Sequence, residues 1–287
     1  MATLHLLGCG TPTPSSSRFG TSYVLCLDRD RLMFDCGPAT TYKLVRAGLW
    51  PTQIDYLFFT HHHFDHNADY PCFLLCRWDQ SIGKENRLNV FGPRKTEQIT
   101  RRLIGPRGAF TFDWRARVNA PVSQCVHRNR GGTLPRPAPD IAVTDVDPGI
   151  VVERPGWAVH AARAQHVQPW LESLAYRVVT PGGCVFFAGD TGLCPSIIEA
   201  AAGADVLVVN CWDHQDTMES NGEAPGQTGT RDAAHMARAA GARMLVLTHI
   251  GARLATPEGR EHALAEISSI YAGQVVFGEE MTSLELW

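Results

Sequence analysis

The chain lacks any apolar stretch of about 18 residues, the length that a membrane-spanning helix requires. At its N-terminus it also lacks the basic segment and the apolar segment that mark a secretory signal peptide. A predicted strand over residues 4–7 begins almost at once instead. These absences predict a soluble, cytoplasmic protein.

A disulfide framework is absent as well. The nine cysteines are odd in number and scattered singly, so we expect buried thiols in a reducing compartment. Cys72 and Cys76 are four residues apart and could share a metal on one helix face. Small core residues are the commoner use of such cysteines, and no second pair with zinc-site spacing accompanies them.

Positive charge is not in excess either. The formal net charge of -3 does not favour bulk attraction to nucleic acid, and binding of that kind would need a local basic patch. At 287 residues and 44% hydrophobic, the chain can bury a substantial core. We expect one α/β domain that spans residues 1–287.

Short apolar runs alternate with segments of helical periodicity, which predicts a layered α/β fold. Strands are predicted near 4–7, 23–27, 32–35, 56–60, 88–91, 151–153, 157–162, 175–180, 185–188, 206–210, 244–248 and 275–277. Helices are predicted near 40–47, 68–76, 94–103, 195–201, 230–240 and 257–270.

The most informative segment is a histidine-rich run after the strand predicted over residues 56–60. His61, His63, Asp65 and His66 form the pattern H-x-H-x-D-H at the carboxyl end of that strand, where open α/β sheets place their ligands. Four ligands of this kind in six residues are too many for one tetrahedral site. The spacing predicts two neighbouring metals, with His61 and His63 on one and Asp65 and His66 on the other. A solvated or tag-like histidine tract is the alternative, but tags lie at termini.

Two later strands also end in side chains that can bind metal. The strand predicted over 185–188 is followed by Asp190, and the strand over 244–248 by His249. A carboxylate has two oxygens and can bridge two metals, which an imidazole cannot, so Asp190 is the expected bridge. The alternatives are a helix N-cap for Asp190, contributing about 1 kcal/mol, and a hydrogen-bonded loop histidine for His249.

Through these motifs the chain resembles the metallo-β-lactamase fold hydrolases, and within them the ribonuclease Z and arylsulfatase-like branch. One such motif would be a weak signal, but the blocks follow the order of the family along nearly the whole chain. They are Leu7-Gly8-Cys9-Gly10-Thr11-Pro12-Thr13-Pro14, Arg18, Gly20-Thr21-Ser22, Phe34-Asp35-Cys36-Gly37, the histidine run, His166, Glu172-Ser173-Leu174-Ala175-Tyr176-Arg177, Phe187-Ala188-Gly189-Asp190-Thr191 and Leu247-Thr248-His249-Ile250.

The resemblance implies a four-layer αββα sandwich and a homodimer. It also implies two divalent metal ions, with Zn²⁺ expected first and manganese or iron as alternatives. Asp65 would, besides binding metal, orient the attacking hydroxide. For His166, as for His249, a hydrogen-bonded loop histidine is the alternative. The implied ligands are His61, His63, Asp65, His66, His166, Asp190 and His249.

The chain departs from ribonuclease Z at two places. The arm that binds the tRNA body is missing, because only residues 178–188 separate Arg177 from Gly189. In addition, Gln227 stands where the family has the histidine that protonates the leaving oxygen, and Asn210 stands where that histidine has its glutamate partner. An amide can hydrogen-bond to the leaving group but cannot titrate, and loss of a general acid costs about 10²–10⁴-fold. His214 is a candidate replacement, and a loop surface histidine is the alternative.

An insertion at about 103–140 is rich in arginine and aromatic residues. Phe110, Phe112 and Trp114 alternate as on a short strand with one aromatic face. We expect this insertion to cover the site as a lid in which Arg115 and Arg117 bind phosphate or sulfate oxygens. A solvent-facing or dimer-contacting insertion is the alternative.

Together these features predict hydrolysis of a small anionic ester by hydroxide generated at the metals. The first hypothesis is a phosphodiesterase acting on a cyclic nucleotide or an aryl phosphodiester. Hydrolysis of a lactone, a thioester or a sulfate ester is the alternative, and the first two of these predict an apolar pocket. Cleavage of tRNA 3′ ends is disfavoured by the two departures, and a non-catalytic binding module by the complete set of ligands. Neither a membrane nor long nucleic acid is an expected partner.

Overall fold

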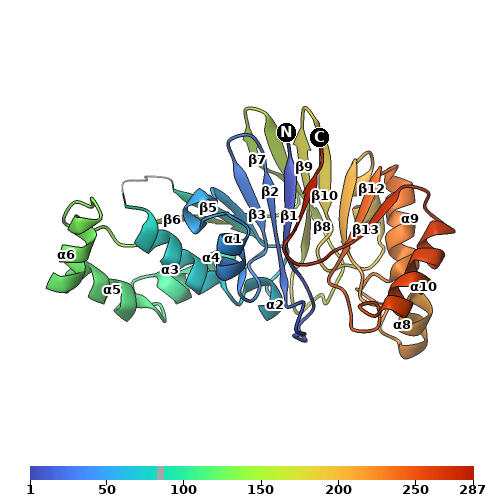
Figure 1. The fold of residues 1–287 in the computed structure, drawn as a ribbon, viewed down its shortest axis with the longest axis horizontal. Helices are drawn as coiled ribbons and strands as arrows, with labels where there is room; N and C mark the ends of the chain where they lie inside the picture. The colour runs from blue at the N-terminus through green and yellow to red at the C-terminus, as the bar shows by residue number, and fades with distance from the viewer. Residues whose placement is uncertain (83–86) are drawn as a thin grey trace.

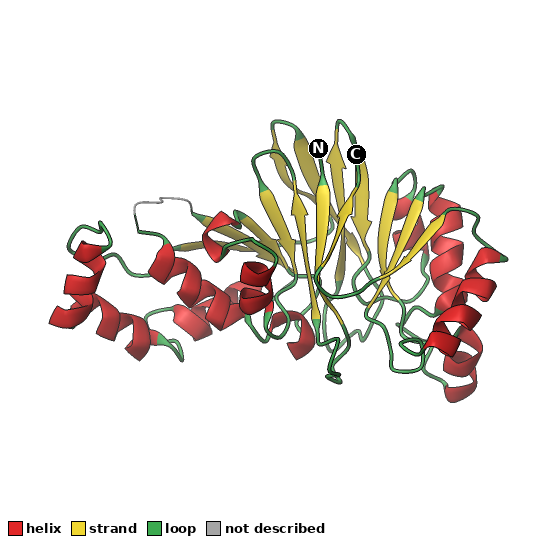
Figure 2. Ribbon diagram, in the orientation of Figure 1, coloured by secondary structure: helices red, strands yellow, loops and turns green. Residues whose placement is uncertain are grey.

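The computed structural model describes residues 1–82 and 87–287. Two seven-stranded sheets pack against each other, and helices lie on their outer faces, as Figures 1 and 2 show. The four-layer αββα sandwich expected from the resemblance is therefore confirmed. Each helix in the described part of the chain is too short or too polar to cross a membrane.

The first sheet contains the N-terminal strands and the last strand, in the order β14-β1-β2-β3-β4-β5-β6. Strands β3 to β6 pair in parallel, so their carboxyl ends meet at one edge. The elements of this half are β1 (Thr3–Cys9), β2 (Thr21–Cys26), β3 (Arg31–Phe34), α1 (Thr40–Arg46), a 3₁₀ turn η1 (Pro51–Gln53), β4 (Tyr56–Phe58), α2 (Phe64–Asn67), α3 (Tyr70–Gln80), β5 (Leu88–Gly92), α4 (Thr96–Ile104), α5 (Thr111–Asn119), α6 (Pro121–Asn129), β6 (Ile141–Asp145) and β14 (Thr282–Glu285).

The second sheet has the order β13-β12-β11-β10-β9-β8-β7. Strands β10 to β13 pair in parallel, and α7, α9 and α10 pack their apolar faces against the outer side of this sheet. The elements of this half are β7 (Gly149–Arg154), β8 (Trp157–Arg163), β9 (Leu174–Thr180), β10 (Gly183–Phe187), α7 (Pro195–Ala201), β11 (Val206–Asn210), α8 (Gln215–Asn221), α9 (Thr230–Ala240), β12 (Met244–Thr248), α10 (Pro257–Ser268) and β13 (Gln274–Phe277).

Aromatic side chains join the two sheets. The rings of Phe34 in β3 and Phe187 in β10 stack with their centroids 3.9 Å apart. The Tyr176 hydroxyl in β9 donates a hydrogen bond of 2.8 Å to the Phe59 carbonyl, which directly follows β4. These contacts hold the parallel strands of one sheet against those of the other, so that the loops after β4 and β10 come close together.

The arginine-rich insertion differs from its prediction. Residues 111–119 form α5 and not a strand, and the aromatic side chains do not share a face. Trp114 is only 9% exposed and its indole donates to the Ile104 carbonyl at 2.9 Å, whereas Phe112 is 75% exposed. Three alternating aromatic residues were too short a pattern to exclude a helix, and the buried Trp114 anchors that helix to the end of α4.

All nine cysteines lie in the described part of the chain and are free thiols, as the absence of a disulfide pattern predicted. The prediction that the thiols are buried was only partly correct, because Cys72 and Cys125 are exposed. The Sγ atoms of Cys72 and Cys76 lie 3.9 Å apart on α3.

Candidate metal centre

The candidate centre lies where loops from both sheets meet. The chain leaves β4 through His61 and His63 into the short helix α2, which carries Asp65 and His66. His166 follows β8, Asp190 follows β10 and His249 follows β12, because each of these strands ends in a turn at the same edge of the sandwich. The structure brings together all seven residues that the sequence predicted as ligands.

Six of the seven side chains divide into two groups. In the first, His63 Nδ1 lies 3.1 Å from His61 Nε2 and 3.3 Å from His166 Nε2. In the second, Asp65 Oδ2 lies 3.6 Å from His66 Nε2 and 3.2 Å from His249 Nε2. His61 and His66 also form a metal-competent group with Asp190, so the assignment of His61 with His63 to one metal and of Asp65 with His66 to the other stays a prediction.

The Asp190 carboxylate lies between the two groups. Its Oδ2 is 4.0 Å from His61 Nε2, 3.9 Å from His166 Nε2 and 3.3 Å from His249 Nε2. Its Oδ1 is 3.7 Å from His66 Nε2. A carboxylate in this position can offer oxygens to both groups, which is the arrangement that a bridging ligand needs.

The backbone around the centre adopts conformations that few residues accept. Gly189 has φ +63°, and a Cβ at this position would lie 2.9 Å from the Thr60 Cβ, so only glycine fits before Asp190. His249 and Asp35 also have positive φ, at 51° and 58°, although neither is glycine. Such strain is common at functional sites, where the surrounding structure holds it in place.

Asp35 supports the centre from behind and was not predicted as a site residue. Its carboxylate accepts hydrogen bonds from the Thr60 amide at 2.7 Å, the Thr60 hydroxyl at 2.8 Å and His66 Nδ1 at 2.8 Å. The bond to Nδ1 leaves His66 Nε2 facing Asp65 and Asp190. The sequence signals for this role were an aspartate at the end of a buried strand and its place in the Phe34-Asp35-Cys36-Gly37 block.

The acidic and basic side chains of the cluster shift the pKa values of one another. Burial raises the pKa of a carboxyl, but His249 and His66 outweigh this effect and hold the pKa of Asp190 well below its usual range. Burial disfavours charge on His66 too, yet Asp35 and Asp190 raise the pKa of His66 well above its usual value. Burial, reinforced by His66, lowers the pKa of His61, which keeps that imidazole neutral and able to bind metal.

The polar atoms of the cluster are not satisfied by the protein alone. Among the described residues, Asp65 Oδ1, His66 Nε2 and His249 Nδ1 are buried without a hydrogen-bond partner. Such groups usually have a partner, because burying them without one costs about 1–3 kcal/mol each. Five imidazoles and two carboxylates are a donor set that suits divalent zinc, manganese or iron. The residues present therefore fit a divalent metal centre.

A cavity of about 290 Å³ adjoins this centre on the side of His249, since Ile250 and Gly251 line it. Trp212 also lines the cavity, and its ring lies 5.9 Å from that of His249. Arg18 contributes a guanidinium whose Nε is buried without a hydrogen-bond partner. These cavity residues were not grouped from the sequence, since they come from distant loops.

Arg115 and Arg117 are not brought to the centre. Arg115 donates to the Pro106 carbonyl at 3.3 Å, and Arg117 pairs with Asp113 and Asp79. Figure 1 shows α5 and α6 at the end of the molecule next to α3 and α4, well away from α2. The prediction that this insertion forms a lid over the site is therefore not met within this chain.

His214 is not part of the cluster either. It precedes α8, and its ring stacks on that of His262 in α10 with a centroid distance of 4.5 Å. Burial and the neighbouring His262 lower the pKa of His214. None of its described contacts is with the seven predicted ligands, so its proposed role as the replacement acid gains no support.

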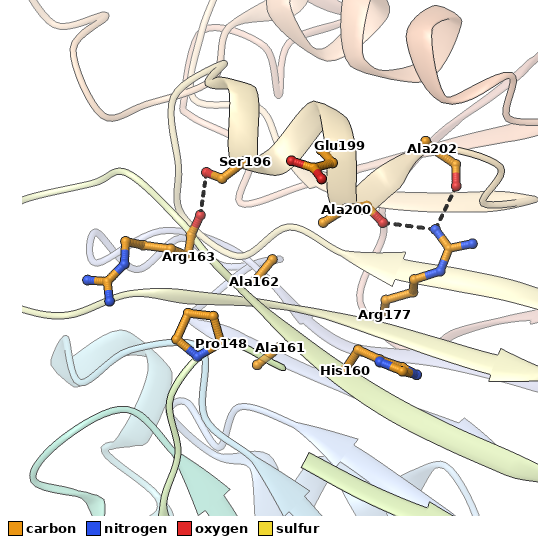
Figure 3. Close-up of a pocket in the computed structure, with 10 residues that line it drawn as sticks. All are labelled: Pro148, His160, Ala161, Ala162, Arg163, Arg177, Ser196, Glu199, Ala200 and Ala202. Carbon is orange, nitrogen blue, oxygen red and sulfur yellow. Dashed lines mark hydrogen bonds between the residues drawn. The ribbon is translucent and has the colours of Figure 1, made fainter. Parts of the chain in front are cut away.

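A second cavity, of about 740 Å³, lies apart from the centre on the outer face of the second sheet (Figure 3). His160 and Arg177 reach it from adjacent strands, and Glu199 reaches it from α7. Arg177 donates to the carbonyls of Ala200 and Ala202, each at 2.8 Å, which ties β9 to the end of α7. Neither the seven predicted ligands nor the residues next to them in the chain line this cavity, whereas Ile250, next to His249, lines the smaller one. The larger volume therefore does not make this cavity the site of metal chemistry.

Zinc is expected to stabilise the metal-free protein. At a free Zn²⁺ concentration about 100 times Kd, linkage predicts about 2.7 kcal/mol of stabilisation, and thus a rise in Tm of about 5–10 °C. Differential scanning fluorimetry after treatment with chelator measures this shift. Ca²⁺ is the control, because it prefers oxygen ligands to imidazoles. Equal shifts with both ions would contradict an imidazole-rich site.

The comparisons with known proteins agree with this geometry. Residues 30–250 match the family model described as a β-lactamase superfamily domain. A ribonuclease Z from Methanothermobacter thermautotrophicus is 28% identical over 289 residues, covering 88% of each chain. A ribonuclease Z from Mycobacterium sp. strain KMS is 27% identical over 295 residues, covering 100% of this chain and 96% of the relative.

Solved structures share the fold across almost the full length. The metallo-β-lactamase fold protein YhfI from Bacillus subtilis has a TM-score of 0.76 and 19% identity, with 99% of both chains covered. The short form of human tRNase Z has a TM-score of 0.69 and 20% identity, again with 99% of both covered. A diphosphatase from the PhnP family has a TM-score of 0.66 and 18% identity, with 100% of this chain and 98% of that one covered.

Proposed function

The chain belongs to the β-lactamase superfamily, as a metal-dependent hydrolase, and on that premise we propose that it is a phosphodiesterase for small anionic substrates. Two divalent ions, Zn²⁺ first, would be held by His61, His63 and His166 on one side and by Asp65, His66 and His249 on the other, with Asp190 between them. When bound, the ions would lower the pKa of water towards neutrality and offset the negative charge of the reacting group.

The observation that carries the proposal is the position of Asp190 between two groups of metal-competent side chains. Asp65 has a second role. Its Oδ2 faces His66 and His249, whereas its Oδ1 has no hydrogen-bond partner in the described part of the chain. This oxygen is available to accept a hydrogen bond from the attacking water and so to orient it.

The adjoining cavity supports a small anionic substrate. Its volume of about 290 Å³ suits a small molecule better than a folded nucleic acid. Trp212 offers a ring for stacking, and Arg18, which lines the cavity, offers a guanidinium to an anionic oxygen, although its Nη2 also donates to the Gly278 carbonyl at 3.4 Å. The ribonuclease Z relatives and the PhnP-family diphosphatase support phosphoester chemistry, as opposed to lactone or thioester chemistry, for such a substrate. A homodimer and a cytoplasmic location stay predictions.

Metal analysis combined with a substrate panel tests the proposal. Untreated protein should contain about two equivalents of zinc and hydrolyse bis-p-nitrophenyl phosphate, and chelator should abolish this turnover. The same preparation should hydrolyse p-nitrophenyl sulfate, a lactone and a thioester much more slowly. Preferential turnover of any of these three would assign the site to that chemistry, and inactivity of the metal-loaded protein on all four would favour a binding module.

Replacing Arg18 with alanine should raise KM for bis-p-nitrophenyl phosphate about tenfold, because a charge-assisted hydrogen bond contributes about 1.5–3 kcal/mol. The kinetics of a neutral ester, p-nitrophenyl acetate, should not change. Steady-state kinetics on both substrates provide the measurement. The matched control is Arg128→Ala, which removes an exposed arginine of α6. An unchanged KM for the phosphate in Arg18→Ala would exclude this guanidinium from substrate binding.

A further inference from the structure

Two amide side chains lie hydrogen-bonded to each other beside the candidate centre. Asn210, the last residue of β11, is 3% exposed, and its Nδ2 donates to Gln227 Oε1 at 3.0 Å. Because Oε1 is the acceptor in this bond, the Gln227 Nε2 group keeps its two N–H donors. In the part of the chain that the structure describes, neither donor has an acceptor, and Gln227 is only partly buried.

Other contacts fix this pair next to the predicted ligands. Gly226, which directly precedes Gln227, accepts a 2.8 Å hydrogen bond from His166 Nδ1 through its carbonyl. The Thr228 hydroxyl, on the other side, donates to the Thr191 carbonyl at 2.6 Å, and Thr191 follows Asp190. Asn210 ends the strand that lies between β10 and β12, which lead to Asp190 and His249. The pair therefore borders the cluster on the side formed by the second sheet.

No histidine is left to donate a proton there. Five of the twelve histidines belong to the cluster itself. The other seven, all in described parts of the chain, have contacts elsewhere. His214 and His262 stack on each other, and His160 lines the outer cavity. The remaining four have hydrogen-bond partners: His5 with Ser283, His62 with Thr96, His127 with Thr133, and His235 with Arg238. An amide pair is neutral whichever way its groups are oriented, so it offers a hydrogen bond but not a proton.

We infer that the Asn210–Gln227 pair makes this centre selective for esters whose leaving oxygen departs as a stable anion. A nitroaryl oxide or a phosphate meets this condition. Unsubstituted phenoxide, whose conjugate acid has a pKa of about 10, meets it less well, and the alkoxide of a sugar or a simple alcohol does not. The inference rests on the proposed hydrolytic function and defines its substrate class.

The reaction balances without an acid from the protein. The bond from the water oxygen to phosphorus forms as the bond from phosphorus to the leaving oxygen breaks. The electron pair of the broken bond stays on the leaving oxygen, which accepts a hydrogen bond from Gln227 Nε2 and departs as an anion. Solvent supplies its proton after release and takes up the proton that the attacking water loses. Asn210 is a positioning residue, because it acts only through Gln227.

Two diesters that differ only in the leaving group test the inference: methyl 4-nitrophenyl phosphate and methyl phenyl phosphate. Phenol has a pKa of about 10, like the tyrosine side chain, and nitrophenol is more acidic. The zinc-loaded wild type should hydrolyse the nitrophenyl ester at least about 10²-fold faster in kcat/KM. The double variant Asn210→Glu/Gln227→His, which installs a titratable pair, should raise kcat/KM for the phenyl ester relative to that for the nitrophenyl ester at least about tenfold, because only the poorer leaving group needs a proton.

Controls separate a local effect from a general one. Gln274→His makes the same exchange at an exposed position of β13 and should change neither rate. Asn210→Ala and Gln227→Ala should each lower kcat more than they raise KM, and together they should cost no more than one alone, since Asn210 acts through Gln227. Metal content and Tm of each variant establish that the centre and the fold persist.

Similar wild-type rates on the two esters would overturn the inference, and this comparison needs no variant to fold. So would an equal gain on both esters in the double variant. If chelator-sensitive turnover of the nitrophenyl ester is absent in zinc-loaded wild type, the proposed function itself fails, and the inference fails with it.

Discussion

Replacing Asp190 with asparagine is expected to lower kcat/KM for bis-p-nitrophenyl phosphate by about 10⁴-fold or more and to reduce bound zinc from two equivalents to one or fewer. The side chain is almost isosteric, but the amide carries no charge and has one oxygen in place of two. Asp190 lies within 4.0 Å of ligand nitrogens in both groups, so one substitution weakens both halves of the centre. Elemental analysis and steady-state kinetics on the same preparation measure the two effects.

The matched control is Asp147→Asn, which makes the same exchange at an exposed aspartate before β7 and should change neither quantity. Thermal unfolding of the metal-free proteins identifies any loss of fold. If Asp190→Asn retained two equivalents of zinc and ordinary turnover, Asp190 would be a structural residue of the β10 turn and not the ligand between two metals.

The clustering of the seven residues could be predicted because several of them follow buried strands that the sequence makes visible. The apolar runs that become β4, β10 and β12 end in His61, Asp190 and His249 after only one to three further residues. In parallel sheets the carboxyl ends of neighbouring strands share one edge, so residues distant in sequence were expected to converge there. The strand that was predicted near 185–188 and the strand observed at Gly183–Phe187 agree to within two residues.

The parts that sequence could not predict depend on tertiary contacts. Asp35 is identified as a support only because the fold places it 2.8 Å from His66 Nδ1. Trp212 and Arg18 line one cavity although nearly 200 residues separate them, and neither belongs to a periodic pattern. For Arg115 and Arg117 the sequence predicted a role at the site that the fold does not support. Their composition suggested substrate contacts, but local packing of Trp114 directs the segment into a helix that lies away from the centre.

Replacing Asp35 with alanine is expected to weaken zinc binding about 10–100-fold and to destabilise the metal-free fold by at least about 3 kcal/mol. The carboxylate is fully buried and accepts three hydrogen bonds, so its loss leaves the Thr60 amide, the Thr60 hydroxyl and His66 Nδ1 without that acceptor. Without the bond to Nδ1, the His66 ring is also free to rotate its Nε2 away from Asp65 and Asp190. Urea unfolding with chelator measures the loss of stability, and competition against a chromophoric chelator measures zinc affinity.

Asp35→Asn separates the two effects. The asparagine oxygen can take the place of Asp35 Oδ2 and still accept from the Thr60 hydroxyl, while the asparagine Nδ2 replaces the Oδ1 that accepts from the Thr60 amide, so stability should fall, but less than in the alanine variant. The oxygen can also accept from His66 Nδ1, but without the negative charge that favours this tautomer and strengthens Nε2 as a ligand. Zinc affinity should therefore fall in both variants, while only alanine should produce the full loss of stability. Equal stability losses with unchanged zinc affinity would mean that Asp35 supports the fold of the Thr60 turn and has no influence on the metal.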